Sequence, residues 1–286
     1  MTVAAAIVEL DARAARLAGE GEAEGAGWAW YRAASLCADH DPGRAAGLLA
    51  AADDAIAARR APRLAGSIAL LASELALDRG DPATGAAASV AAERAFQAAG
   101  DARGFLAVWV ARALRALRGG DPAAGLLMCR WMLPWLDEVA EPAPRLWLRL
   151  FAADELRAGD RPVEAIALLA EALDLAAPGS AEHLVVAERL TAAFLAIDRP
   201  ADAARIAVAA IDGPSPGPAG LRARLYRTLA GSLRATAPGP LAEVCAALAA
   251  ALDDEEVAAP EPTPAAVAGA LLAPQVIGAA PRPPAG

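Results

Sequence analysis

Apolar and small residues recur with helical spacing on both sides of six regularly placed prolines. The prolines stand at positions 42, 82, 122, 162, 200 and 238, so the intervals between them are 40, 40, 40, 38 and 38 residues. A nearly constant period predicts a repeated unit whose neighbouring copies bury each other's apolar faces. Aligning the prolines predicts six helix pairs, at residues 22–61, 62–101, 102–141, 142–180, 181–217 and 218–257.

The residue before each proline predicts how well the second helix of each pair is capped. Asp41, Asp81 and Asp121 precede the first three prolines. An N-cap carboxylate accepts backbone N–H groups, and proline fits the first helical position because it lacks an N–H. Asp160 and Asp198 stand one place earlier in the fourth and fifth pairs, and the sixth pair has no such aspartate. Capping is therefore expected to weaken toward the C-terminus.

Both ends of the repeated region differ from the units between them. Residues 1–21 contain an amphipathic pattern over 3–19, which predicts a capping helix, because the ends of a helical-repeat array need a cover. From about residue 254 proline recurs too often for another helix pair. We expect residues 258–286 to form a disordered tail rich in proline and alanine.

Small residues recur at three positions of each pair: nine residues before the proline, and three and ten residues after it. The first five pairs keep this pattern apart from Met132, whereas the sixth has leucine at all three positions. Counting the sixth pair from Pro240 instead gives Gly231, Glu243 and Ala250. The pattern resembles that of tetratricopeptide repeats, most closely in LRAGDRPVEAIALLAEALDLAAP at residues 156–178.

This resemblance implies an all-α, right-handed superhelical solenoid of about six antiparallel helix pairs. HEAT-like pairing is the alternative. In the family the first helices of successive pairs line a concave groove that binds a peptide or a helical segment of a partner protein. Carried over residue by residue, the groove consists of Trp30, Leu70, Glu74, Val110, Leu114, Trp147, Leu150, Asp154, Arg157, Glu188 and Tyr226.

Two tryptophans on a second helix form another candidate surface. Trp131 and Trp135 are four residues apart, so they lie on one helix face and form a candidate convex patch for a partner. The competing interpretation is that they fill space between helices rich in alanine. Pro134, between them, is expected to kink this helix or to end its regular run.

Charge and cysteine content exclude several classes of function. The net charge of −9 disfavours nucleic acid as a partner, because binding a phosphate backbone needs a basic face. The three cysteines are far apart in the sequence, which predicts neither a disulfide framework nor a zinc site and fits a reducing cytoplasm. The N-terminus lacks the basic region of a signal peptide, and no segment resembles a membrane span.

Catalytic motifs are missing from the sequence. His40 and His183 are its two histidines, and neither lies in a recognisable motif for catalysis, metal binding or phosphate binding. We therefore predict no catalytic residue, no metal site and no cofactor. The leading prediction is a cytoplasmic, non-enzymatic adaptor, of a kind known from bacteria, that binds a protein or peptide.

Two alternatives remain at this point. The chain could be a sensory or regulatory repeat protein that acts on a transcription regulator or a signalling ATPase. It could also be a structural protein that forms homo-oligomers by stacking its end repeats.

Overall fold

The chain folds into α-helices throughout the part that its computed structural model describes, which comprises residues 2–57, 60–119, 121–139, 142–212, 218–236 and 239–252. None of these residues lies in a strand, so the predicted all-α class is confirmed. The predicted tail, 258–286, lies outside the described residues. The helices are α1 (Val3–Gly19), α2 (Ala23–Cys37), α3 (Pro42–Ile56), α4 (Pro62–Asp78), α5 (Pro82–Ala98), α6 (Ala102–Gly119), α7 (Pro122–Val139), α8 (Pro142–Ala158), α9 (Pro162–Leu175), α10 (Ala181–Ala196), α11 (Pro200–Ile211), α12 (Ala219–Thr236) and α13 (Pro240–Leu252).

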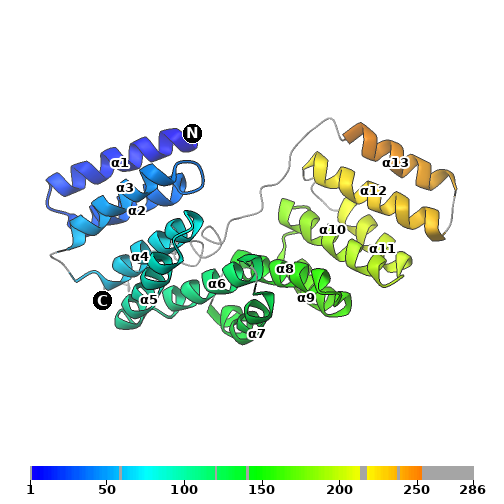
Figure 1. The fold of residues 1–286 in the computed structure, drawn as a ribbon. Helices are drawn as coiled ribbons and strands as arrows, with labels where there is room; N and C mark the ends of the chain where they lie inside the picture. The colour runs from blue at the N-terminus through cyan, green and yellow to red at the C-terminus, as the bar shows by residue number, and fades with distance from the viewer. Residues whose placement is uncertain are drawn as a thin grey trace, which may run out of the picture. The chain divides into compact units, whose positions relative to one another are not determined.

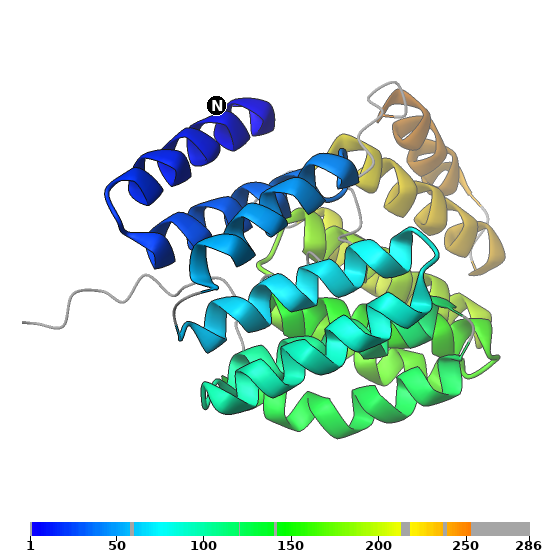
Figure 2. The same cartoon turned by 60° about the vertical axis from the view of Figure 1, so that its left-hand side comes forward.

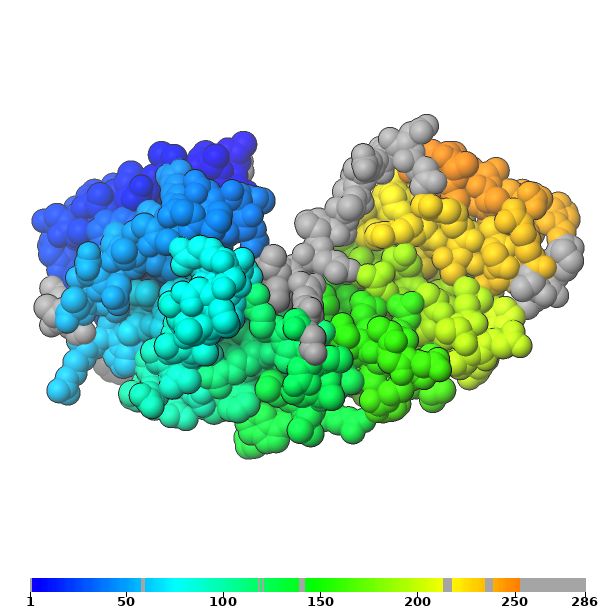
Figure 3. All heavy atoms as spheres, viewed as in Figure 1, coloured from blue at the N-terminus to red at the C-terminus, as the bar shows by residue number. Residues whose placement is uncertain are grey.

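The described helices form two compact units, residues 2–111 and 112–252, and the boundary falls inside α6. In the first unit α1 packs on α2, and α2 packs on α3 (Figure 1). Figure 2 shows α4 and α5 lying side by side in the same unit. In the second unit α8 pairs with α9, α10 with α11, and α12 with α13. The atoms of α12 and α13, yellow and orange in Figure 3, form one continuous surface. The predicted pairing of neighbouring helices is confirmed, while the residue limits of the six units and their forty-residue period stay predictions.

The first helices of successive pairs also contact one another. In the first unit α2 touches α4, and in the second unit α8 touches α10 and α10 touches α12. Helices α2, α8 and α10 therefore each pack against their own partner and against the next first helix. This arrangement buries more than one face of the first helices, which matters for the location of any binding surface.

Helix α1 covers the first helix pair, as the amphipathic pattern predicted. Ile7 and Ala14 on its inner face are buried. The indole Nε1 of Trp30 on α2 donates a hydrogen bond to Asp11 Oδ1 on α1 at 3.0 Å. Trp30 thus joins α1 to the array.

The Asp-Pro signals cap the second helices in the first three pairs. Asp41, Asp81 and Asp121 accept hydrogen bonds from the backbone N–H three residues later, at 2.9, 3.0 and 3.0 Å respectively. The N-caps of α9 and α11, Arg161 and Arg199, make no such side-chain bond. The predicted loss of capping is confirmed for these two helices.

The displaced aspartates of the fourth and fifth pairs end the preceding helix. Asp160 and Asp198 adopt φ angles of 57° and 56°, in the left-handed region. Gly80 occupies the equivalent place in the second pair with a φ of 77°. Glycine adopts this conformation without a steric penalty, whereas a side chain with a Cβ is strained there.

Small residues stand where helices approach most closely. A Cβ added to Gly85 on α5 would lie 2.5 Å from Leu77 Cγ on α4, and one added to Gly125 on α7 would lie 2.7 Å from Leu117 Cγ on α6. Alanines that stand three or ten residues after the repeated prolines are fully buried, namely Ala45, Ala52, Ala92, Ala165, Ala172 and Ala203. These positions therefore set the distance between paired helices.

The register of the last pair differs from both sequence alignments. α13 begins at Pro240, and Leu241 and Leu248 are 61% and 41% exposed, so counting from Pro238 is wrong. Counting from Pro240 is also wrong, because it selects exposed residues. The buried small residues are Ala230, Ala242 and Ala249, which match a count from Gly239. Burial of small side chains, and not the proline, sets the register here.

Gly85→Ala should lower the free energy of unfolding by about 1–3 kcal/mol, because the new methyl group overpacks the α4–α5 contact. Gly47→Ala is the matched control, since Gly47 is exposed inside α3 with nothing within 4 Å of an added Cβ. It should raise stability by about 1 kcal/mol through helix propensity. Chemical denaturation measures both, and equal effects at the two sites would contradict the close-approach assignment.

Asp160→Gly should raise the free energy of unfolding by on the order of 1 kcal/mol, because glycine removes the strain of a Cβ at a φ of 57°. Gly80→Asp makes the reverse change at the equivalent turn and should lower stability. Thermal and urea unfolding of both variants checks this pair. A stabilising Gly80→Asp would show that the left-handed residue does not limit stability.

Candidate functional site

Five residues of the predicted groove are buried. Leu70, Val110, Leu114 and Leu150 are almost fully covered, and so is Glu74. They lie on first helices, which pack against several neighbours at once. These side chains pack between helices, and partner binding at these five positions stays a prediction that their burial does not favour.

Three aromatic residues of the predicted groove are partly buried against their own unit. Trp30 is tied to α1 through Asp11. The ring of Trp147 stacks on Phe151, with centroids 6.0 Å apart, and Tyr226 packs against the core of the second unit. Their rings therefore contribute mainly to packing.

The remaining three predicted residues, Asp154, Arg157 and Glu188, belong to one row of charges in the second unit. Arg157 Nη1 on α8 lies 3.2 Å from Asp154 Oδ1, and Arg189 Nε on α10 lies 3.2 Å from the same carboxylate. At the other end of the row, Arg224 Nε on α12 lies 3.5 Å from Glu188 Oε2 on α10. We call Arg157, Asp154, Arg189, Glu188 and Arg224 the charge ladder.

The charge ladder alternates in sign across three first helices, and all five side chains are partly exposed. It holds three guanidinium groups and two carboxylates. Glu188 Oε2 is buried and has no hydrogen-bond partner in the described part of the chain; its contacts with Arg224 and, at 3.9 Å, with Arg189 are ionic. The partly exposed guanidinium groups of the ladder can donate hydrogen bonds to a ligand, and its partly exposed carboxylates can accept them.

The sequence analysis missed Arg189 and Arg224, because neither stands at a helix position that was carried over from the tetratricopeptide repeats. Each arginine reaches a carboxylate on its own helix or on the adjacent first helix. A signal was present in the recurrence of arginine among the apolar residues of α8, α10 and α12, but that spacing does not reveal which side chains meet.

Helix α7 carries a second surface. Leu127, Trp131 and Trp135 follow one another at four-residue steps and are 70%, 51% and 53% exposed. We call them the α7 face. Both tryptophans of the predicted convex patch lie on it. Pro134 lies within the helix, which continues to Val139, so the helix does not end at the proline.

A buried arginine fastens α7 to its neighbours. Arg149 on α8 is 4% exposed and donates hydrogen bonds to Asp137 Oδ2 on α7 at 2.7 Å and to Glu171 Oε2 on α9 at 2.8 Å. Arg145 adds a bond to Asp137 Oδ1 at 2.9 Å. Burial by itself raises the pKa of Asp137, but the hydrogen bonds and charges of Arg149 and Arg145 together lower it below the usual value.

The three cysteine thiols stay protonated near neutral pH. Cys37, Cys129 and Cys245 are buried, and burial raises the pKa of each. The pKa of Cys129 reaches about 12. Cys129 lines an apolar cavity of about 230 Å³ between α7, α8 and α9, whose mouth is flanked by the Arg130–Glu164 ion pair. A protonated thiol is a poor nucleophile, so this cavity has no nucleophilic group of its own.

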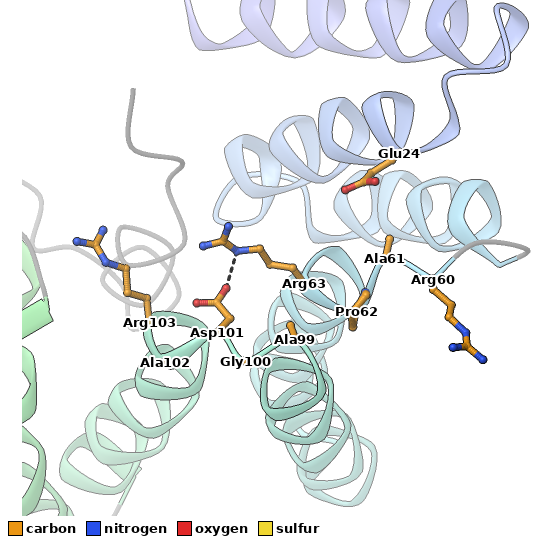
Figure 4. Close-up of a pocket in the computed structure, with 10 residues that line it drawn as sticks. All are labelled: Glu24, Arg60, Ala61, Pro62, Arg63, Ala99, Gly100, Asp101, Ala102 and Arg103. Atoms are coloured by element: carbon orange, nitrogen blue, oxygen red, sulfur yellow. Dashed lines mark hydrogen bonds and ion pairs between the residues drawn. The ribbon is translucent and has the colours of Figure 1, made fainter. Parts of the chain in front are cut away.

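A polar pocket of about 430 Å³ lies in the first unit, at the starts of α4 and α6 (Figure 4). Arg63 Nε donates to Asp101 Oδ2 at 2.5 Å, and Asp101 Oδ1 caps α6 by accepting from Gly104 N. The side chain of Arg60 points away from this pair in Figure 4. Arg63 and Asp101 stabilise the fold and Arg60 points elsewhere, so the charged groups of the pocket do not converge on a common ligand position.

Metal and membrane chemistry find no support in the described ranges. Among these residues no group of three or more histidine, cysteine, aspartate or glutamate side chains could hold a metal ion. No helix described here is long and apolar enough to cross a membrane. Burial lowers the pKa of His183, so its imidazole is neutral at pH 7.

The fold and these surfaces define an all-α protein of packed helix pairs. No protein-family profile matches the chain. No curated protein is similar to it in sequence. One of the solved structures that resemble it is the crystal structure of NprR in complex with its cognate peptide NprX, with 14% sequence identity, a TM-score of 0.49, and coverage of 80% of this chain and 67% of that one.

Asp137→Asn should destabilise the protein by on the order of 1 kcal/mol at pH 7, a modest value because Asp137 is partly exposed. Its pKa is lowered in the folded state, so its stabilisation is present above the unfolded pKa of about 3.9 and is lost as pH falls through the folded pKa. The difference between the wild type and the variant should therefore shrink below about pH 4. Urea unfolding at several pH values measures it, with exposed Asp174→Asn as control; a difference that persists at low pH would contradict the assignment.

Proposed function

We propose that this chain is a non-enzymatic binding protein that holds an extended segment of another protein along the charge ladder of α8, α10 and α12. The observation that carries the proposal is the alternation of guanidinium and carboxylate groups across three neighbouring helices. An extended main chain presents carbonyl acceptors and N–H donors in alternation. The guanidinium groups can therefore face the main-chain carbonyl groups of the bound segment, and the carboxylates can face its N–H groups.

The size of the ladder limits the length of the bound segment. Packed helices lie about 8–10 Å apart, so three successive first helices span roughly 20 Å. An extended chain advances about 3.3 Å per residue, so about six residues cover the ladder. Three arginines face two carboxylates, which also favours a segment with an acidic side chain.

The same arrangement argues against a phosphate-rich partner. Each arginine of the ladder lies within 4 Å of a carboxylate, so little net positive charge remains. Nucleic-acid binding depends on an excess of basic groups that displaces counterions. A peptide needs no such excess, because hydrogen bonds from charged groups to its main chain suffice.

Arg189→Ala tests the proposal, because Arg189 lies between the two carboxylates of the ladder. Peptides selected by the full chain from a random library should bind this variant about ten- to hundredfold more weakly, as expected for a lost charge-assisted hydrogen bond. Isothermal titration calorimetry measures the affinities.

Arg205→Ala is the matched control, since Arg205 is an exposed arginine on α11 that pairs with Asp202 outside the ladder. It should leave peptide affinity unchanged. Selected peptides that bind Arg189→Ala as tightly as the wild type, or a library that yields no binder at all, would refute peptide binding at the ladder.

A further inference from the structure

The α7 face differs from the matching face of four other second helices. Counting from the proline that begins each helix, the sixth and tenth residues are glycine, alanine, arginine or glutamate in α3, α5, α9 and α11. In α7 the same positions hold Leu127 and Trp131, both exposed. The row that is small or polar in those four helices is large and apolar in α7. In α13, counted from Gly239, the row holds the exposed Val244 and Leu248, so exposed tryptophan is what distinguishes α7 among the described second helices. Exposed tryptophans are enriched at protein interfaces.

We propose that the α7 face docks against the α7 face of a second copy of this chain, with the two helices antiparallel about a two-fold axis. In such a contact the same surface serves both partners. An axis near Leu133 places Trp131 of one copy opposite Trp135 of the other, and Trp135 opposite Trp131. The same two tryptophans, one pair from each copy, thus make both aromatic contacts.

Charges beside the α7 face are complementary under the same symmetry. Glu138 lies just beyond Trp135, and Arg130 lies just before Trp131 on α7. The axis near Leu133 brings Glu138 within two residues of Arg130 of the second copy, or about 3 Å along the helix. Arg130 already donates to Glu164 at 3.0 Å and retains further N–H groups for a second carboxylate.

Pro134 adds a polar contact to this arrangement. Because proline has no N–H, the carbonyl of Arg130 lacks the donor that helix geometry would normally supply from position 134. An indole N–H at an interface needs an acceptor. In the antiparallel arrangement Trp135 of the second copy lies one residue along the helix from this carbonyl and can donate to it.

The face stays in place when the copies separate, because Arg149 fastens α7 to α8 and α9. A surface held in its bound conformation loses little entropy on association. This inference is independent of peptide binding at the charge ladder, since the α7 face includes no residue of the ladder.

Sedimentation equilibrium of the full chain over a range of concentrations tests the proposal. The wild type should form dimers, and Trp131→Ala with Trp135→Ala should raise the dimer dissociation constant by about thirtyfold or more, as expected for two hot-spot residues. The control, Leu241→Ala with Val244→Ala, removes exposed apolar surface from α13 and should leave the dissociation constant unchanged.

A charge exchange guards against variants that fail to fold. Glu138→Arg alone should weaken the dimer by about fivefold or more, and adding Arg130→Glu should restore much of the loss. A wild type that stays monomeric at every concentration would overturn the proposal. So would a dimer that is unaffected by the tryptophan substitutions, or one that is lost equally in the α13 control.

Discussion

Close approach of helices at glycine and alanine is the constraint on which the rest of the structure depends. Phe96 shows how strict it is: its ring lies 2.9 Å from where a Cβ of Gly66 would stand, and it also occupies the Cβ position of Gly104. One phenylalanine on α5 thus fills the space that glycines on α4 and α6 leave open. A contact packed this closely has no room for an added methyl group.

This packing explains why the first helices offer so little surface. A helix that touches its partner and another first helix has several covered faces, and α4, which contacts α2, α3 and α5, is buried along nearly its whole length. Aliphatic residues such as Leu70 and Leu150 then belong to the core. Long side chains are the ones that reach solvent from such helices, because they keep a polar end in water while their stems pack. Arg189 and Arg224 do so.

The sequence was sufficient to predict what depends on local signals. Asp81 followed by Pro82 specifies a cap and a helix start within a few residues, and small residues at a fixed spacing indicate where helices meet. It was insufficient where tertiary packing decides. The register of α13 follows the burial of Ala242 and Ala249 and not its proline, and five of the predicted groove residues are buried in the core. The charge ladder joins residues 35 apart, such as Arg189 and Asp154, and no local pattern marks them.

The two candidate surfaces of the second unit depend on the fold in different ways. The charge ladder is assembled from three helices, so its alternation of charges exists only while small residues such as Ala153 and Ala187 keep those helices close. The α7 face comes from one helix, and its geometry follows from helical spacing and from the bonds of Arg149. A change in helix spacing would therefore alter the ladder before it altered the α7 face. The proposed recognition of a peptide and the proposed association of two copies thus rest on separable physical features of the same unit.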